Sequence, residues 1–251
     1  MKALNLLYKR IARMALCLLL LLCVSSVSSG EDVLSEESLF EEELYDSPLV
    51  SDPFERVNRI IFSFNDLFYT YAGDPLAGMY QRVPLSARSG IGNFFDNLQY
   101  PVRLTGNLLQ GRVSSAWHET RRFALNSTLG LLGLLDSASQ VDGLQKIESE
   151  DVGQALASWG IGEGPYLILP IMGPSNIRDF GGLLGDRFVN PWVDPYSILD
   201  PETQLVYGIG DNISSLPVHL NRYREMKSSA IDPYSALKNA YTQYRRGSIE
   251  R

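Results

Sequence analysis

The sequence has almost no cysteine and almost no histidine. Its 251 residues include two cysteines, Cys17 and Cys23, and two histidines, His118 and His219. Because both cysteines lie near the N-terminus, the rest of the chain has no disulfide framework, no cysteine metal site and no thiol nucleophile. The histidines are about a hundred residues apart, and neither belongs to a metal-binding pattern such as H-E-x-x-H. We therefore expect no metal ion and no cofactor, and packing or surface roles for both histidines.

Basic residues are also scarce relative to acidic ones. The chain has 22 lysines and arginines against 29 aspartates and glutamates, which gives a net charge of −7. Residues 1–30 contain four of the basic residues and none of the acidic ones, so the remaining chain has a net charge of −11. A domain this acidic is unsuited to nucleic-acid binding and has no basic patch that could attach it to anionic lipid. Any contact with a membrane must then be apolar, or be made through a partner.

A long hydrophobic run is missing after the first thirty residues. No twenty-residue window there is free of both charges and helix breakers, so we expect no transmembrane helix in the mature chain. At the N-terminus, a basic start, an apolar run from Met14 to Val24 and the sequence VSSVSSG follow one another as in a secretory signal peptide. Cleavage after Ser26 or Ser29 fits this layout, and an uncleaved membrane anchor is the alternative.

These features divide the chain into four expected segments. Residues 1–29 are the signal peptide, and residues 30–51 are an acidic segment that we expect to be flexible because its charges repel and little of it can be buried. Residues 52–246 are expected to form one folded domain, followed by a tail at 247–251.

Apolar residues at helical spacing dominate the expected domain. In DPFERVNRIIFSFNDLFYTY, which starts at Asp52, they recur every three or four positions opposite a polar face. Asp52 is expected to cap this helix, with Pro53 at its first position and Glu55 completing a capping box. The spacing does not decide whether the apolar stripe faces a core or contacts lipid. Further helices are expected at 86–98, 104–110, 113–128, 152–159, 202–215 and 233–246. Because period-two alternation is scarce, the class is mainly α.

One segment departs from the helical pattern, EGPYLILPIMGPSNIRD from Glu163 to Asp179. Its apolar run from Tyr166 to Ile171 lies between two Gly-Pro pairs, which predicts a hairpin or an extended strand pair. The hairpin could move, or it could simply pack on the rest of the domain, and both interpretations stay open.

A second segment, NSTLGLLGLLD from Asn126 to Asp136, places two glycines among leucines. It predicts either a tight helix contact or helix end, or a flexible apolar wall able to accept an acyl chain. Signals for catalysis are sparse. Ser175 follows a Gly-Pro pair but lacks the G-x-S-x-G elbow. A lipid-modifying hydrolase that uses Ser175 with His118 or His219 is one alternative function, and a structural envelope protein is another.

Five blocks of the sequence, in order from Asp52 to Arg246, resemble the MlaA (VacJ) family of outer-membrane proteins. They read DPFERVNRIIFSFN, VPLSARSGIGNFFDNLQYPVRLTGNLLQG, RRFALNSTLGLLGLLDSAS, EDVGQALASWGIGEGPYLILPIMGPSNIRD and DPYSALKNAYTQYRR. The resemblance implies a single helical ring-like domain with an apolar hairpin, embedded in the inner leaflet of the outer membrane. It also implies an amphipathic channel through the ring and neither enzyme activity nor a cofactor.

The resemblance further implies a role and partners. Family members remove mislocalised phospholipid from the outer leaflet, associate with a trimeric outer-membrane porin, and pass the lipid to a soluble periplasmic lipid carrier. Candidate lipid-path residues are Phe62, Phe64, Tyr166, Leu167, Leu169, Ile171, Met172, Gly173 and Arg178. For Arg178 the interpretations are headgroup binding or helix-end pairing. The family usually carries a lipidated N-terminal cysteine, but Leu22 before Cys23 departs from the required small residue.

Overall fold

The structure is a computed structural model that describes residues 50–193 and 195–250. The expected signal peptide, Cys23 and most of the acidic segment lie outside the described residues. In chain order the elements are α3 (Glu55–Phe68), the π-helix η1 (Tyr69–Gly73), α4 (Asp74–Tyr80), α5 (Leu85–Leu98), α6 (Tyr100–Leu109), α7 (Val113–Thr128), the short 3₁₀ helix η2 (Ala138–Gln140), α8 (Val152–Ser158), β1 (Tyr166–Leu169), β2 (Gly173–Asn176), α9 (Ile177–Val189), α10 (Pro201–Ser229) and α11 (Pro233–Ile249).

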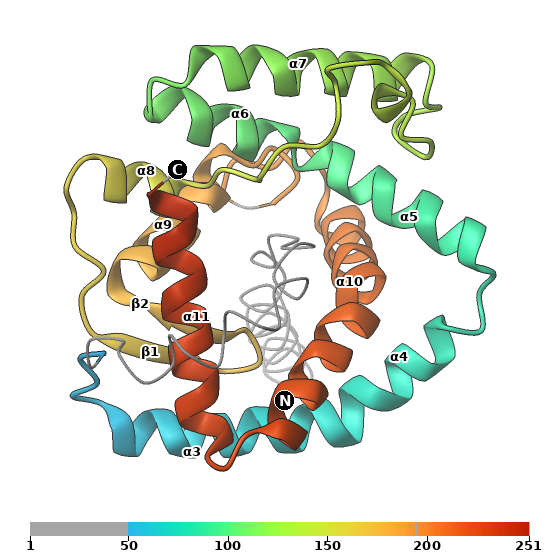
Figure 1. Cartoon of the computed structure of the whole chain (residues 1–251). Helices are drawn as coiled ribbons and strands as arrows, with labels where there is room; N and C mark the ends of the chain where they lie inside the picture. Colours follow the sequence, from blue (N-terminus) through green and yellow to red (C-terminus); the bar gives the residue numbers. More distant parts are fainter. Residues whose placement is uncertain (1–49, 194, 251) are drawn as a thin grey trace, which may run out of the picture.

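The helices are arranged in a ring (Figure 1). α3 and α4 form one side and α5 the next, α6 and α7 lie opposite α3, and α8, α9 and the β1–β2 hairpin complete the circuit. α10 packs against α4 and α5, and α11 packs against α8 and β2, so that both helices lie on the inner side of the ring. The expectation of a mainly α, ring-like domain with a hairpin is confirmed.

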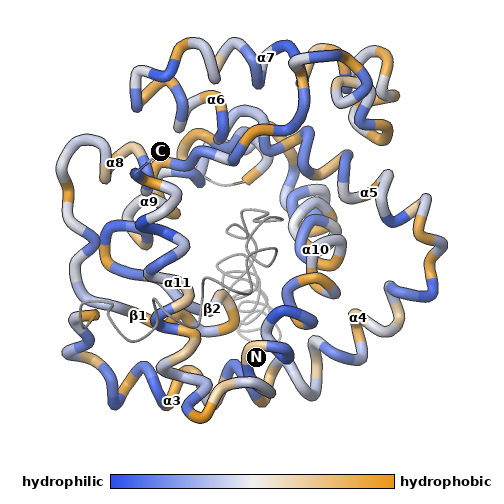
Figure 2. The backbone as a smooth tube through the Cα atoms, in the orientation of Figure 1, coloured by the Kyte–Doolittle hydropathy of each residue, from blue (hydrophilic) through white to orange (hydrophobic). Residues whose placement is uncertain are grey.

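Among the residues that the structure describes, the ring has no large central apolar core. Tyr166, Ile168 and Tyr234 form its buried hydrophobic cluster, which lies to one side between the hairpin and α11. Many other buried side chains are polar or charged, and Figure 2 shows apolar residues spread around the whole circuit. The fold therefore depends on a series of local contacts between neighbouring elements, many of them polar.

The first helix of the ring, α3, buries polar side chains and exposes apolar ones, which is the reverse of a helix that packs on the core of a water-soluble protein. Its buried residues are Asn58 and Asn65. Large apolar side chains on other positions of the same run are exposed, including Ile60 at 70 % and Leu67 at 57 %. The apolar stripe of α3 thus faces largely outward, which decides the orientation that spacing alone left open. Within the described residues, no helix combines the length and apolarity needed to cross a bilayer.

The predicted cap of α3 is wrong. The helix begins at Glu55, and no side chain from the described part of the chain caps its N-terminus. The Asp52 carboxylate instead accepts hydrogen bonds from the side chains of Asn58, Tyr234 and Lys238. Two of these donors belong to α11, and the lysine is charged, so Asp52 joins α3 to α11 instead of closing the first turn.

Several helix boundaries also differ from the predicted ones. α6 begins at Tyr100 rather than 104, with Pro101 in its first turn. α10 continues past residue 215 to Ser229 although it contains Pro217. α4 and α9 were not predicted at all. In α9 the glycines resemble helix breakers, but a Cβ on Gly182 would lie 2.4 Å from Gly153 Cα, so the small residue permits close contact with α8.

The leucine-rich segment after α7 forms a tight turn. α7 ends at Thr128, and Leu131, Leu132 and Gly133 follow with left-handed φ values of 54°, 63° and 97°. A Cβ on Gly130 would lie 2.2 Å from the carbonyl oxygen of Leu135, which excludes any larger residue there. The helix-end interpretation of this segment is confirmed, whereas its role as an acyl-chain wall stays a prediction.

Candidate functional site

The predicted hairpin is present, and its two faces differ. β1 and β2 are antiparallel, with Tyr166 opposite Asn176 and Leu169 opposite Gly173. Because side chains alternate along a strand, Tyr166 and Ile168 are buried, whereas Leu167 and Leu169 lie on the other face and are partly exposed. The hairpin thus divides the predicted lipid-path residues of β1 between two surfaces.

The buried face joins the hairpin to α3 and α11 through aromatic contacts. The ring of Tyr166, which is 1 % exposed, lies 6.3 Å from the rings of both Tyr234 and Tyr241. Phe62 contacts the same cluster, with its ring centre 5.9 Å from that of Tyr234 in an edge-to-face arrangement. Two of the predicted residues, Phe62 and Tyr166, are therefore brought together. Phe64 is half exposed and is not part of this cluster.

Two asparagines of α3 act as a substitute third strand along β1. The side-chain amide of Asn58 donates to the carbonyl of Tyr166 at 3.1 Å, and its oxygen accepts from the amide of Ile168 at 2.9 Å. Further along the strand, Asn65 donates to the carbonyl of Leu169 at 2.9 Å and accepts from the amide of Ile171 at 2.6 Å. We call Asn58 and Asn65 the asparagine clamp. The exposed edge of the strand is thereby satisfied by side chains.

The spacing of this asparagine clamp matches the two backbones. Seven residues of α-helix rise about 10.5 Å, and three residues of strand rise about 10 Å. Asn58 and Asn65 can therefore contact β1 in the same way at two successive positions. Neither residue was predicted from the sequence. The available signal was a pair of asparagines seven positions apart, opposite the apolar stripe.

The turn between the strands is attached to η1, the π-helix that follows α3. Ile171 and Gly173 both have left-handed φ values, 67° and 89°, and the hydroxyl of Tyr69 donates to the carbonyl of Ile171 at 2.6 Å. Ile171 and Met172 are half-buried, and Gly173 is buried. Glycine suits the position of Gly173 because a side chain would be strained at that φ.

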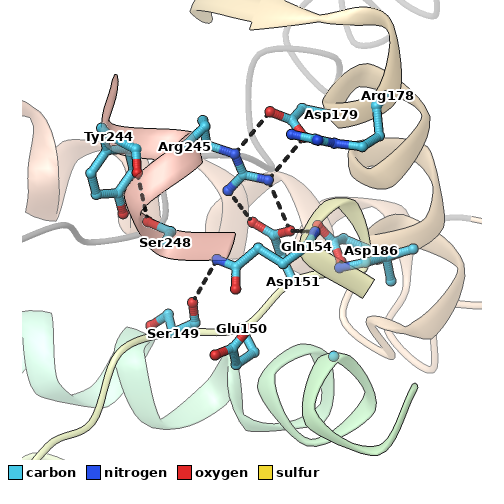
Figure 3. A network of polar contacts seen from close by, with 12 residues as sticks. Ser149, Glu150, Asp151, Gln154, Arg178, Asp179, Asp186, Tyr244, Arg245 and Ser248 are labelled. Atoms are coloured by element: carbon cyan, nitrogen blue, oxygen red, sulfur yellow. Dashed lines mark hydrogen bonds and ion pairs between the residues drawn. The ribbon is translucent and has the colours of Figure 1, made fainter. Parts of the chain in front are cut away.

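The base of the hairpin meets a buried charged network centred on Asp179 (Figure 3). Arg245 donates to Asp179 through two nitrogens, at 2.8 and 3.0 Å, and also contacts Asp151 at 2.7 Å. Arg178 donates to Asp179 at 2.9 Å, and the Tyr241 hydroxyl does so at 2.6 Å. Burial alone would raise the pKa of Asp179, but these donors outweigh burial and lower it to about 2.

We call the side chains of Asp151, Arg178, Asp179, Tyr241 and Arg245 the Asp179 network. It joins α8, α9 and α11, and Arg178 is only 7 % exposed within it. The geometry of Arg178 is therefore that of pairing in the first turn of α9. Close to the network, Asp186 accepts from the amide of Val152 at 2.9 Å, and burial and the carboxylate of Asp151 raise its pKa.

The residues of the alternative hydrolase are not brought together. Ser175 donates to the carbonyl of the next residue, and His118 contacts the carbonyl of Gln145. Burial and the nearby Arg222 lower the pKa of His219 to about 4. Across residues 50–193 and 195–250, no hydrogen bond joins Ser175 to either histidine, so these side chains form no nucleophile–base pair.

Sequence comparison decides the family. The family profile described as MlaA lipoprotein matches residues 50–248. The chain belongs to the MlaA lipoprotein family. Among its MlaA relatives is the intermembrane phospholipid transport system lipoprotein MlaA of Escherichia coli (strain K12), 34 % identical over 206 residues, or 77 % of this chain and 76 % of the relative.

Other relatives and a solved structure agree with the MlaA assignment. The MlaA lipoprotein of Haemophilus influenzae is 29 % identical over 77 % of both chains, and an uncharacterised protein of Rickettsia prowazekii is 33 % identical over 80 % of this chain and 79 % of its own. A structure solved as the structural basis for maintenance of bacterial outer membrane lipid asymmetry superposes with a TM-score of 0.68 at 30 % identity, over 79 % of this chain and 99 % of that chain. The MlaA ring is therefore shared well beyond the sequence motifs.

Proposed function

We propose that this protein is the outer-membrane component of an intermembrane phospholipid transport system. In this role it removes mislocalised phospholipid from the outer leaflet and passes it to a soluble periplasmic carrier, which maintains lipid asymmetry. The names of its relatives support the system, since three of them are phospholipid transport lipoproteins. The observation in this chain that carries the proposal is the exposed apolar stripe of α3.

Large apolar side chains exposed on the ring are energetically unfavourable in water. Fully burying one large apolar side chain is worth about 1.5–3 kcal/mol. Val57, Ile60, Phe64, Leu67 and Tyr71 are each about half or more exposed on α3 and η1. Their exposed surface equals that of about three whole side chains, so transfer of this run into lipid would gain roughly 5–9 kcal/mol. We assign this outer face to the inner leaflet of the outer membrane and to contact with a trimeric porin.

A phospholipid also needs a route that accepts its charged headgroup, because an unpaired charge in apolar surroundings is very costly. One face of α11 carries Tyr234, Tyr241 and Arg245. Their side chains donate hydrogen bonds to Asp52, Asp179 and Asp151, respectively. The opposite face, at helical spacing, carries small and neutral polar residues, which are Ala236, Asn239, Ala240, Gln243 and Gly247. We propose that this face is one wall of an amphipathic channel on the inner side of the ring.

The hairpin supplies the apolar contacts of the proposed path. We assign acyl-chain contacts to the partly exposed Leu167, Leu169, Ile171 and Met172, with Gly173 shaping the turn. Phe64 would contact lipid from the outer face. We assign Phe62, Tyr166 and Arg178 to positioning the hairpin instead of contacting lipid. Tyr166 and Arg178 are buried, and Phe62 packs on the hydrophobic cluster that contains Tyr166. Lipid would move passively along this path, driven by the relative affinities of membrane and carrier.

Complementation tests the proposal. The full chain is expressed in Escherichia coli that lacks its own MlaA, and outer-leaflet phospholipid and growth on detergent with chelator are measured. We expect the chain to restore both to wild-type levels. If the folded chain reaches the outer membrane yet leaves outer-leaflet phospholipid at the level of the deletion strain, the transport proposal is overturned.

A substitution then tests the path. Leu169→Glu should impair complementation because a carboxylate on the open face of β1 repels acyl chains, while the thermal unfolding midpoint changes little. Gln145→Glu introduces the same charge at an exposed position outside the hairpin and should complement normally. Equal complementation by both variants would remove Leu169 from the lipid path.

A further inference from the structure

The backbone of the hairpin turn is strained at Ile171. This residue has a φ of 67°, in the left-handed region. A β-branched side chain rarely adopts that region, because its Cβ substituents crowd the backbone, and such a residue marks a turn that other contacts must maintain. Gly173, two positions later, adopts a similar φ without this penalty. The strain is therefore confined to one residue of the turn.

Both polar backbone groups of Ile171 are held by side chains from outside the hairpin. Its amide donates to the Asn65 side chain at 2.6 Å, and its carbonyl accepts from the Tyr69 hydroxyl at 2.6 Å. Asn65 and Tyr69 are four positions apart, one helical turn, so they reach the amide and the carbonyl of the same residue, on the two peptide units that flank its Cα. These contacts are what opposes relaxation of the turn.

Tyr69 occupies an unusual position in the helix. It is the first residue of the π-helix Tyr69–Gly73, which separates α3 from α4. π-turns are rare and occur frequently at functional sites, because the extra residue redirects the side chains around it. The phenol ring is fixed from the other side, since it lies 5.2 Å from the ring of Tyr223 in α10. The direction of the hydroxyl is thus set by α10 and by the π-turn together.

We infer that Tyr69 is a positioning residue that latches the hairpin turn, holding Ile171 in its strained conformation through one hydrogen bond. Release of this bond lets the turn relax and displaces Ile171 and Met172. The consequence for lipid rests on the proposed function of the hairpin. The latch itself depends only on the contacts around Ile171.

Hydrogen exchange measures the latch directly. In Tyr69→Phe the ring and its contact with Tyr223 remain, and only the hydroxyl is lost. We expect exchange of the Ile171 amide, followed by mass spectrometry of overlapping hairpin peptides from the full chain in detergent, to accelerate about 3- to 10-fold, as loss of one neutral hydrogen bond implies. Exchange of the Tyr166 and Ile168 amides, which contact Ser51 and Asn58, should stay unchanged.

Tyr80→Phe is the matched control. It removes a hydroxyl from α4 that has no hydrogen-bond partner among the described residues, so it should leave Ile171 exchange at the wild-type rate. Equal Ile171 exchange in wild type, Tyr69→Phe and Tyr80→Phe would overturn the latch. A general acceleration at Tyr166, Ile168 and Ile171 would also overturn it, because Tyr69 would then stabilise the whole hairpin.

Two further variants test the strain. Asparagine tolerates a left-handed φ, whereas valine keeps the β-branch of isoleucine. In the Tyr69→Phe background, Ile171→Asn should therefore slow amide exchange at position 171 back towards wild type, and Ile171→Val should not. Identical exchange in the two double variants would show that the turn stores no strain and would overturn the strained latch.

Lipid transfer separates the latch from the proposed function. Vesicles that contain the full chain and a fluorescent phospholipid are mixed with acceptor vesicles, and the transfer rate is measured for each variant. We expect Tyr69→Phe to raise the rate in parallel with Ile171 exchange, and Tyr80→Phe to leave it unchanged. Faster exchange with an unaltered transfer rate would support the latch and would remove the hairpin from the lipid path.

Discussion

The base and the turn of the hairpin are fixed to the ring by different chemistry. At the base, the buried carboxylate of Asp179 binds the guanidinium groups of Arg178 and Arg245. At the turn, the neutral side chains of Asn65 and Tyr69 bind the backbone of Ile171. Breaking a buried ion pair costs about 3–5 kcal/mol, whereas a neutral hydrogen bond contributes about 0.5–1.5 kcal/mol. The difference implies that the base of the hairpin stays attached to the ring, whereas thermal motion can break the hydrogen bonds that attach the turn.

The largest expected effect comes from removing the charge at the base. Arg245→Leu leaves Asp179 and Asp151 without their shared cation, and we expect the free energy of unfolding to fall by about 3–5 kcal/mol in denaturant titrations. Arg246→Leu is the neighbouring control, because its contact with Glu163 is partly exposed and should contribute no more than about 1 kcal/mol. If the two variants are equally stable, the base is not the stronger attachment.

Close packing at the base gives the next effect. Gly182→Ala would place a methyl group 2.4 Å from Gly153 Cα, in backbone that has little room to move, and should destabilise the protein by about 1–3 kcal/mol. Gly181→Ala adds the same methyl group at the preceding residue, where no described atom lies within 4 Å, and should be neutral or stabilise the helix by up to about 1 kcal/mol. Equal unfolding midpoints for these two variants would show that α8 and α9 do not depend on the glycine contact.

The asparagine clamp lies between base and turn, and its loss should have an intermediate effect. Asn58→Ala leaves the carbonyl of Tyr166 and the amide of Ile168 without their partner, which costs about 1–3 kcal/mol. Asn221→Ala, on the exposed part of α10, should change stability by less than about 0.5 kcal/mol. The clamp would be refuted if hydrogen exchange at Ile168 were the same in both variants.

The sequence could predict the hairpin but not its attachments. Two Gly-Pro pairs around an apolar run are local signals, and they located the strands within a few residues. The clamp required knowing that Asn58 and Asn65 face β1 across more than a hundred residues of chain, which no local pattern contains. The same limit explains Asp52, whose partners on α11 outweigh its local preference to cap, and α9, whose glycines suit a contact with α8.

The arrangement of the apolar residues shows a further limit. Spacing identified the stripe on α3, but an outward and an inward stripe have the same period. Asparagines at the buried positions 58 and 65 were the residues that distinguished the two orientations, because a core-facing helix would bury its apolar side chains instead. The ring itself was predictable only through resemblance to the MlaA family.

The smallest expected effect concerns pH at the base. Burial and Asp151 raise the pKa of Asp186 above the ordinary value of about 3.9. The folded state then binds this proton more tightly than the unfolded state, so the contribution of Asp186 to stability is complete below about pH 4 and decreases as pH rises through the raised pKa. Arg245 and Asp179 also face this carboxyl, and their effects on its pKa partly offset one another.

Asp186→Asn keeps an oxygen for the Val152 amide and removes the titration. Stability should therefore become flatter between pH 5 and pH 8 and exceed that of wild type at pH 8 by on the order of 1 kcal/mol. Denaturant titrations at both pH values measure this, and parallel curves for variant and wild type would show that Asp186 does not titrate there. Because Asp179 is held ionised down to about pH 2, the same titrations should leave the ion pairs of the base intact, and the hairpin would stay attached at its base while only its turn is free to respond.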